Sequence, residues 1–151
     1  MGLQIGALYV RRSAFLVASP ERVWREFASG ERIRRWLDRG HSIHEFDARV
    51  GGVVRMSVAI DGVVHFFGGT VLVMEPGREL SLSTQWEGEL ATPYPRFWTI
   101  RLTPLHEGTL VELIHHGFER AQGDAGGELE DYESGWDNKH LIALRQIVLG
   151  A

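Results

Sequence analysis

Residues 53–69 read VVRMSVAIDGVVHFFGG, and this stretch decides the fold class. Two runs rich in Val, Ile and Phe flank Asp61-Gly62, a dipeptide favoured in two-residue hairpin turns. The period of two continues on both sides, and further turn-forming pairs stand at Gly51-Gly52, Pro76-Gly77 and Glu107-Gly108. We therefore predict consecutive antiparallel hairpins built from strands near 43–49, 53–60, 63–74, 79–86, 96–104 and 109–116.

Helix patterns stand on both sides of this strand region. A strand over 7–17 ends at Ser19-Pro20, where a serine N-cap and a proline in the first turn predict a helix. A second short helix is predicted from Ser29-Gly30 to Gly40. Apolar residues then recur at helical spacing from Leu129 to Val148. The predicted order is β-α-α-β6-α, an α+β single domain over residues 1–151.

Composition narrows the class of protein. The chain has 151 residues, no cysteine and a formal net charge of −4, which fits one globular domain and excludes a disulfide framework or a cysteine nucleophile. The acidic balance argues against nucleic-acid binding. No apolar run reaches the ~20 residues of a membrane span, and the first residues lack the pattern of a secretion signal. We predict a cytoplasmic protein with no nucleic-acid partner and no membrane span.

The long sheet must bury one face against the C-terminal helix. Six or seven strands present more surface than one helix can cover, so we expect the sheet to curl around the helix and to leave space for a small ligand. Residues 63–74 are apolar on both faces, so alternation does not assign His65, Phe66 or Phe67 to one face of the sheet. Strand alternation directs the following side chains inward: Val54, Met56, Val58, Ile60, Leu80, Leu82, Thr84, Trp86, Trp98, Ile100, Leu102, Val111, Leu113 and His115.

Two histidines are candidates for chemistry in that space. His115 has the inward parity of the last strand, and His140 follows Trp136 by one helical turn. Neutral imidazole suits proton transfer or the orientation of a polar ligand group, and the alternative is a histidine satisfied by backbone or water. His41 and His44 stand three apart outside any firm helix and make a poor chelating pair. The sequence predicts no metal site and no cofactor.

A series of short motifs follows one order along residues 8–148. They are Ala18-Ser19-Pro20-Glu21-Arg22-Val23-Trp24, Trp36-Leu37, the Gly51-Gly52 turn, Gly69-x-Val71 running to Pro76, Gly108-Thr109 with Val111, Leu113 and His115, Gly117-Phe118, and Gly135-Trp136. In this order and spacing the chain resembles the heat-shock-protein-90 ATPase activator homologues. These belong to the START-type helix-grip (SRPBCC) superfamily, which also holds polyketide cyclases and the birch-pollen allergen.

The resemblance implies a curved antiparallel sheet that grips a long C-terminal helix around a cavity. Relatives usually carry an apolar residue where this chain has His140. We predict binding of a small, mostly apolar or aromatic molecule. The sequence does not decide between a monomer and a homodimer. The alternatives are a cyclase, aromatase or dehydratase that uses His115 or His140, and a protein-interaction module related to the chaperone activators. The predicted cavity lining is Met56, Val58, Trp86, Trp98, Val111, Leu113, His115, Tyr132, Trp136 and His140.

Overall fold

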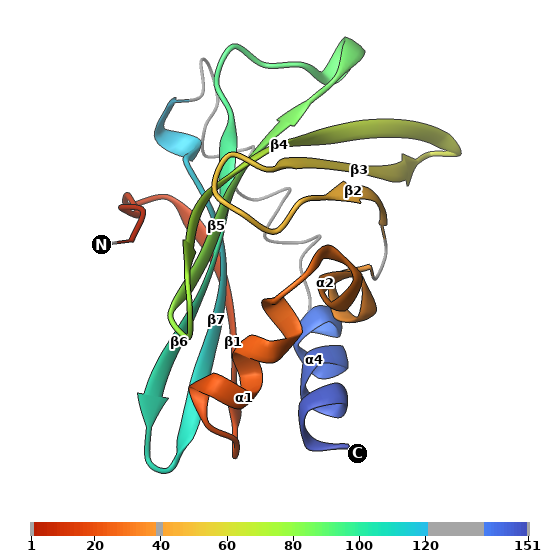
Figure 1. The fold of residues 1–151 in the computed structure, drawn as a ribbon. Coiled ribbons are helices and arrows are strands. Elements are labelled where there is room, and N and C mark those ends of the chain that lie inside the picture. The colour runs from red at the N-terminus through yellow and green to blue at the C-terminus, as the bar shows by residue number, and fades with distance from the viewer. Residues whose placement is uncertain (1, 39–40, 121–137, 151) are drawn as a thin grey trace.

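The computed structural model describes residues 2–38, 41–120 and 138–150. Its order is the predicted one, with seven strands, two short N-terminal helices and a C-terminal helix (Figure 1). The elements are β1 (Tyr9–Leu16), α1 (Pro20–Trp24), α2 (Gly30–Leu37), β2 (Ser42–Phe46), β3 (Val53–Ile60), β4 (Val63–Glu75), β5 (Glu79–Trp86), β6 (Arg96–Leu105), β7 (Gly108–His116) and α4 (Lys139–Leu149). Single 3-10 turns cover Arg25–Phe27, Gly88–Leu90 and Phe118–Arg120.

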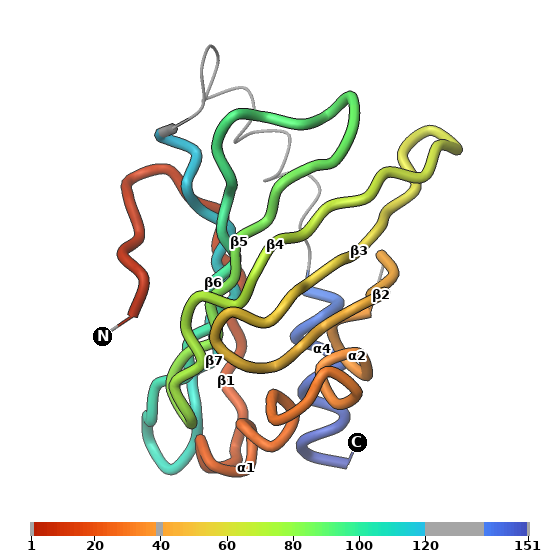
Figure 2. The backbone as a smooth tube through the Cα atoms, turned by 45° about the horizontal axis from the view of Figure 1, so that its top comes forward, coloured from red at the N-terminus to blue at the C-terminus, as the bar shows by residue number. Residues whose placement is uncertain are grey.

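All seven strands form one antiparallel sheet in the order β1-β7-β6-β5-β4-β3-β2. Figure 2 shows β2, β3 and β4 bending away from the direction of β1, β6 and β7, so that the sheet is curved. Register shifts occur between Ile43 and Glu45 and between Val71 and Val73, and such bulges bend a strand locally. The helix-grip fold and its α+β class are therefore confirmed.

Local sequence explains where the short helices begin. The Ser19 hydroxyl accepts a hydrogen bond from the backbone N–H of Arg22, and Pro20 occupies the first turn of α1. The Ser29 hydroxyl caps α2 in the same way, from the N–H of Arg32. Both caps satisfy a backbone donor that has no partner within the helix. The predicted starts of both helices are confirmed.

The hairpin turns follow the sequence with one correction. Asp61 and Gly62 have φ values of 51° and 79°, as the β3–β4 turn requires. The β6–β7 turn was predicted at Glu107-Gly108, but it is centred on His106 and Glu107, with φ values of 48° and 65°. Gly108 instead begins β7, where a side chain would collide with the carbonyl oxygen of Leu16 on β1. The glycine serves close strand approach and not the turn.

The core lies between the inner face of the sheet and the helices. The helix α4 packs on β1 and α2, and α1 contacts β6 and β7. The apolar stripe of α2, Ile33, Trp36 and Leu37, is fully buried, as predicted. No helix among residues 2–38, 41–120 and 138–150 is long and apolar enough to cross a membrane.

The outer face of the sheet is also covered in part. Residues 2–8 lie along it, where the N–H of Leu3 donates to Glu79 and the guanidinium of Arg101 donates to the carbonyl of Leu3. Alternation with the inward residues Trp98 and Ile100 also predicts that Thr99 points away from the core. It does lie on the outer face, but its exposed fraction is 0%, because it hydrogen-bonds Ser81 and His116 beneath this covering.

Candidate ligand-binding site

Aromatic side chains from four neighbouring strands meet on the inner face of the sheet. The register pairs Phe67 on β4 with Trp86 on β5, and Trp98 on β6 with His115 on β7. Their ring centroids follow one another at 4.9 Å from Trp86 to Phe67, 5.9 Å to Trp98 and 6.2 Å to His115, and Phe118 lies 5.0 Å beyond. These spacings are those of aromatic pairs in direct contact. We call Trp86, Phe67, Trp98, His115 and Phe118 the aromatic ladder.

Two further histidines approach the ladder from outside the four strands. His140 stands in the first turn of α4, and His41 directly precedes β2. The His41 ring lies 5.2 Å from that of His140, 5.5 Å from Trp98 and 6.0 Å from Phe67, measured between centroids. The first turn of α4 and the connection before β2 therefore meet over the middle of the ladder.

Burial keeps two of the histidines at the ladder, His41 and His115, in the neutral form. Burial lowers the pKa of His115 to about 3, and the nearby charges of His116 and Arg96 act in the same direction. Burial also lowers the pKa of His41 to about 4, while Asp38 acts to raise it and Lys139 to lower it. Both imidazoles are thus uncharged at pH 7. The inner face offers flat apolar rings with polar nitrogen atoms and no imidazolium charge from these two residues.

The sequence assigned most of these residues to the correct face. Trp98, His115 and His140 are buried and lie in or beside the ladder, and Trp86 is a half-buried ladder member. Met56, Val58, Val111 and Leu113 share the inner face by register, Met56, Val111 and Leu113 being buried and Val58 half-buried. Tyr132 and Trp136 lie outside the described residues.

Sequence reasoning did not place four residues that belong to the ladder or contact it: Phe67, Phe118, His41, and His65, whose ring lies 6.4 Å from that of Trp86. Phe67 was left unassigned, but its pairing with Met56 puts it on the inner face, with Phe66 on the outer one. That side follows from the short Asp61-Gly62 turn, which fixes the β3–β4 register. Phe118 follows the last strand, and His41 precedes β2 outside any periodic segment, so alternation could not place either residue.

The structure gives no support to a metal centre in the described part of the chain. No group of three or more His, Asp or Glu side chains within residues 2–38, 41–120 and 138–150 is arranged to hold a metal ion. His41 contacts the ladder, whereas Nε2 of His44 lies 2.7 Å from the Ser57 hydroxyl on the outer face. The neighbours His115 and His116 point to opposite faces, as predicted.

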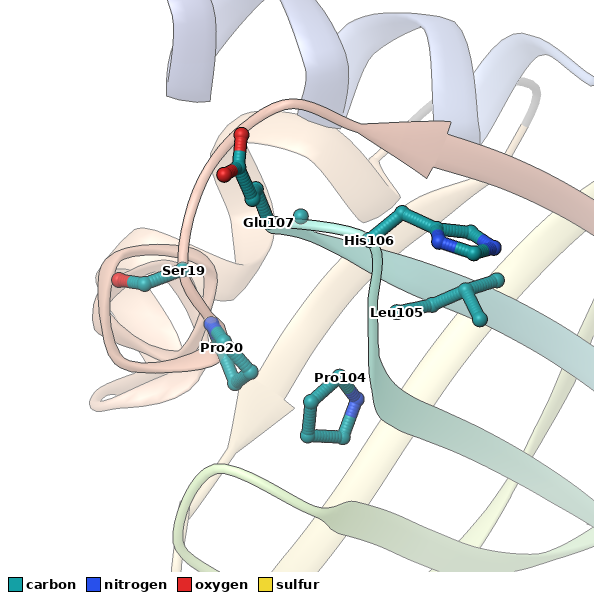
Figure 3. A pocket seen from close by; sticks show the side chains of 7 residues that line it. Ser19, Pro20, Pro104, Leu105, His106 and Glu107 are labelled. Atoms are coloured by element: carbon teal, nitrogen blue, oxygen red, sulfur yellow. The ribbon is translucent and has the colours of Figure 1, made fainter.

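A separate open pocket of about 410 Å³ lies at the far end of β6 and β7. Figure 3 shows Pro20 of α1 and Pro104 of β6 flanking it below the β6–β7 turn. It contains no ladder residue and none of the predicted site residues. Its lining is Ser19, Pro20, Pro104, Leu105, His106, Glu107 and Gly108.

The curved sheet, the covering C-terminal helix and the aromatic inner face define a protein of the helix-grip class. The model of the family "Activator of Hsp90 ATPase homolog 1-like protein" matches residues 17–148, and the chain belongs to this family. No curated protein matches the chain.

Solved structures agree with the assignment. Protein CV1439 from Chromobacterium violaceum is 28% identical, with a TM-score of 0.65 over 92% of this chain and 96% of that one. DynU16, from the dynemicin biosynthetic locus, is 20% identical, with a TM-score of 0.67 over 95% of this chain and 48% of that one. The Aha1 dimer from Colwellia psychrerythraea is 15% identical, with a TM-score of 0.56 over 94% of this chain and 96% of that one. The last two likenesses concern the fold alone.

Proposed function

We propose that this chain, as one domain, binds a small, mostly apolar or aromatic molecule between the inner face of the sheet and the C-terminal helix. The observation that carries the proposal is the aromatic ladder. Five rings in series on one face form a continuous aromatic surface, in which neighbouring rings are inclined to each other by 50–77°. Edge-on aromatic pairs of this kind are favourable beyond simple area burial. Neutral imidazoles within such a surface add hydrogen-bonding atoms without the cost of burying a charge.

The proposed lining keeps every residue predicted from the sequence and adds three. Val111 and Leu113 would form the apolar floor along β7, next to the ladder, and Tyr132 and Trp136 remain part of the proposal from helical spacing alone. The full proposed set is Met56, Val58, Trp86, Trp98, Val111, Leu113, His115, Tyr132, Trp136 and His140, with Phe67, Phe118 and His41 added.

Acid/base catalysis by His115 is less well supported than binding. A general acid or base works best when its pKa lies near the working pH, and burial lowers the pKa of His115 to about 3. At pH 7 this imidazole is not in the imidazolium form that acts as a general acid, and its basicity is low. The cyclase, aromatase or dehydratase alternative would therefore have to rest on other groups.

Fluorescence and melting temperature together test the proposal. Oleate, quercetin and 2-naphthol are titrated into the full chain, and aromatic binding is expected to quench tryptophan emission and raise the melting temperature. Trp98→Phe should remove much of the quenching, because Trp98 lies at the centre of the ladder. The matched control Trp24→Phe should keep it, since Trp24 stacks on Phe27 in the helical region. If none of the three compounds changes either signal, the proposal is wrong.

The remaining proposals concern assembly and location. A homodimer is proposed by analogy with the Colwellia relative, and light scattering of the purified chain measures its mass directly. A cytoplasmic location is proposed from the sequence and is tested by cell fractionation. Neither property is needed for the ligand-binding proposal.

A further inference from the structure

His41 carries a buried nitrogen atom, Nε2, that has no hydrogen-bond partner in the described part of the chain. The same ring contacts Phe67, Trp98 and His140. Buried polar atoms in native proteins are nearly always hydrogen-bonded, and an exception calls for a specific explanation.

His44 shows what the ordinary arrangement looks like three residues later. Its Nε2 atom lies 2.7 Å from the hydroxyl of Ser57, and its ring packs 5.3 Å from Phe66 on the outer face. Both histidines thus contact a phenylalanine of β4, and only His44 has a polar partner in the described chain. The contrast points to a role for His41 that is not cross-strand pairing.

We propose that Nε2 of His41 hydrogen-bonds a hydroxyl or carbonyl group of a neutral ring compound bound on the aromatic ladder. The inference rests on the proposed function and adds to it the chemical class of the ligand's polar group. An apolar ring would lie against Phe67 and Trp98, and one oxygen atom of the ligand would supply the partner that Nε2 lacks. The residue is a specificity determinant and takes no part in a bond-breaking step.

The surroundings of His41 favour a neutral group over a carboxylate. Burial lowers the pKa of His41 to about 4, and the nearby charges oppose each other, Asp38 raising this pKa and Lys139 lowering it. Neutral imidazole serves equally well as donor or acceptor, depending on its tautomer, so it suits a hydroxyl or a carbonyl. A carboxylate at this atom would lose its hydration without gaining an opposite charge from the ring.

A pair of ligands of the same shape isolates this contact. The probes are 2-naphthol and 2-methylnaphthalene, which differ by a hydroxyl in place of a methyl group, and equilibrium dialysis gives the Kd of each for the full chain. His41→Leu removes the nitrogen at similar bulk, and His44→Leu is the matched control. The preference for 2-naphthol, written as the ratio of the two Kd values, should fall about 2–10-fold in His41→Leu, the range for one neutral hydrogen bond. It should stay unchanged in His44→Leu.

The outcomes separate this inference from the function beneath it. If both probes bind and the ratio is the same in His41→Leu and wild type, the inference is wrong and the ligand-binding function stands. If neither probe binds, the inference is overturned, and the ligand-binding function is overturned with it when oleate and quercetin also leave tryptophan emission and melting temperature unchanged. A third probe, 2-naphthoate at pH 7, overturns the neutral class if it binds most tightly and loses that advantage in His41→Leu. Should His41→Leu not fold, the ¹⁵N shift of His41 Nε2 in the wild type must move with 2-naphthol and not with 2-methylnaphthalene.

Discussion

The two faces of the central sheet differ in the hydrogen-bond partners of their buried polar side chains. On the outer face, Glu79, Ser81, Thr99 and His116 form one buried chain of hydrogen bonds, with successive distances of 2.7, 2.9 and 2.7 Å. On the inner face, polar nitrogen atoms are embedded among aromatic rings, and Nε2 of His41 has no partner in the described chain. Both faces bury imidazoles, and they differ in how those imidazoles are satisfied.

The outer chain has a defined direction. Ionised Glu79 can only accept, so the Ser81 hydroxyl donates to it. Ser81 then accepts from Thr99, and Thr99 accepts from Nε2–H of His116, because each hydroxyl has a single proton to give. Burial acts to raise the pKa of Glu79, but hydrogen bonds from Ser81, Arg101 and the N–H of Leu3 outweigh it and lower this pKa.

The same contrast distinguishes two adjacent histidines on β7. His115 and His116 are adjacent on β7 and project to opposite faces. His116 completes a closed network beneath residues 2–8, which is the arrangement expected of a group that holds the fold together. His115 belongs to the aromatic ladder, and the face it occupies is where we propose that a ligand supplies further contacts.

Acid should weaken both faces together, and this is the largest effect that we predict. The pKa values of His41, His115 and His116 lie at about 4, 3 and 4 in the folded chain, below the ~6.5 of an unfolded chain. Below pH 6.5 the unfolded chain therefore binds more protons, and the free energy of unfolding falls as the pH falls. Each histidine contributes at most about 1.4 kcal/mol per pH unit.

Urea unfolding at pH 7.0 and 5.0 measures this loss, which is at most about 6 kcal/mol for the three histidines combined. His41→Leu on the inner face and His116→Gln on the outer face each remove one titrating imidazole. Each variant should therefore lower the number of protons taken up on unfolding by about one. A free energy of unfolding that stays constant between these pH values would show that the imidazoles of both faces remain free to ionise.

The sequence predicted the two faces but not what covers them. Alternation placed Trp98 and His115 correctly, because β6 and β7 pair without a register shift and so keep the period of two. It also placed Thr99 on the outer face, but not its burial there. Residues 2–8 lie over this face and are held by the bonds of Leu3 to Glu79 and Arg101, which are far from Leu3 in the chain. Local periodicity contains no information about such contacts.

Charge pairing around the first two helices was also not predicted from the sequence, although the paired residues are at most nine positions apart. Glu26 lies in the 3-10 turn between α1 and α2, outside the apolar stripe of either predicted helix. Its side chain is only 1% exposed, because Arg22, Arg32 and Arg35 all donate to its carboxylate. That burial depends on how α1 and α2 pack, which helical spacing within each segment does not determine.

Thr99→Val should break the outer network and leave the inner face intact. Valine matches threonine in shape but leaves Ser81 without its donor and His116 without its acceptor, so we expect a loss of about 1–3 kcal/mol in the free energy of unfolding. Thr103→Val is the control on the same strand, because Thr103 is exposed, and it should change stability by less than about 0.5 kcal/mol. Equal losses in the two variants would mean that the outer network contributes nothing. Binding of 2-naphthol should be the same in both variants.

The smallest predicted effect on stability is the sharpest test of the comparison. His41→Leu removes a buried nitrogen atom that makes no hydrogen bond in the described chain, so the free energy of unfolding at pH 7 should change by less than about 0.5 kcal/mol or rise. His44→Leu leaves the buried hydroxyl of Ser57 without its imidazole partner and should cost about 1 kcal/mol. Chemical denaturation without ligand compares the two variants directly. A larger loss of unfolding free energy in His41→Leu than in His44→Leu would mean that His41 stabilises the fold. It would contradict the proposal that Nε2 of His41 binds a ligand.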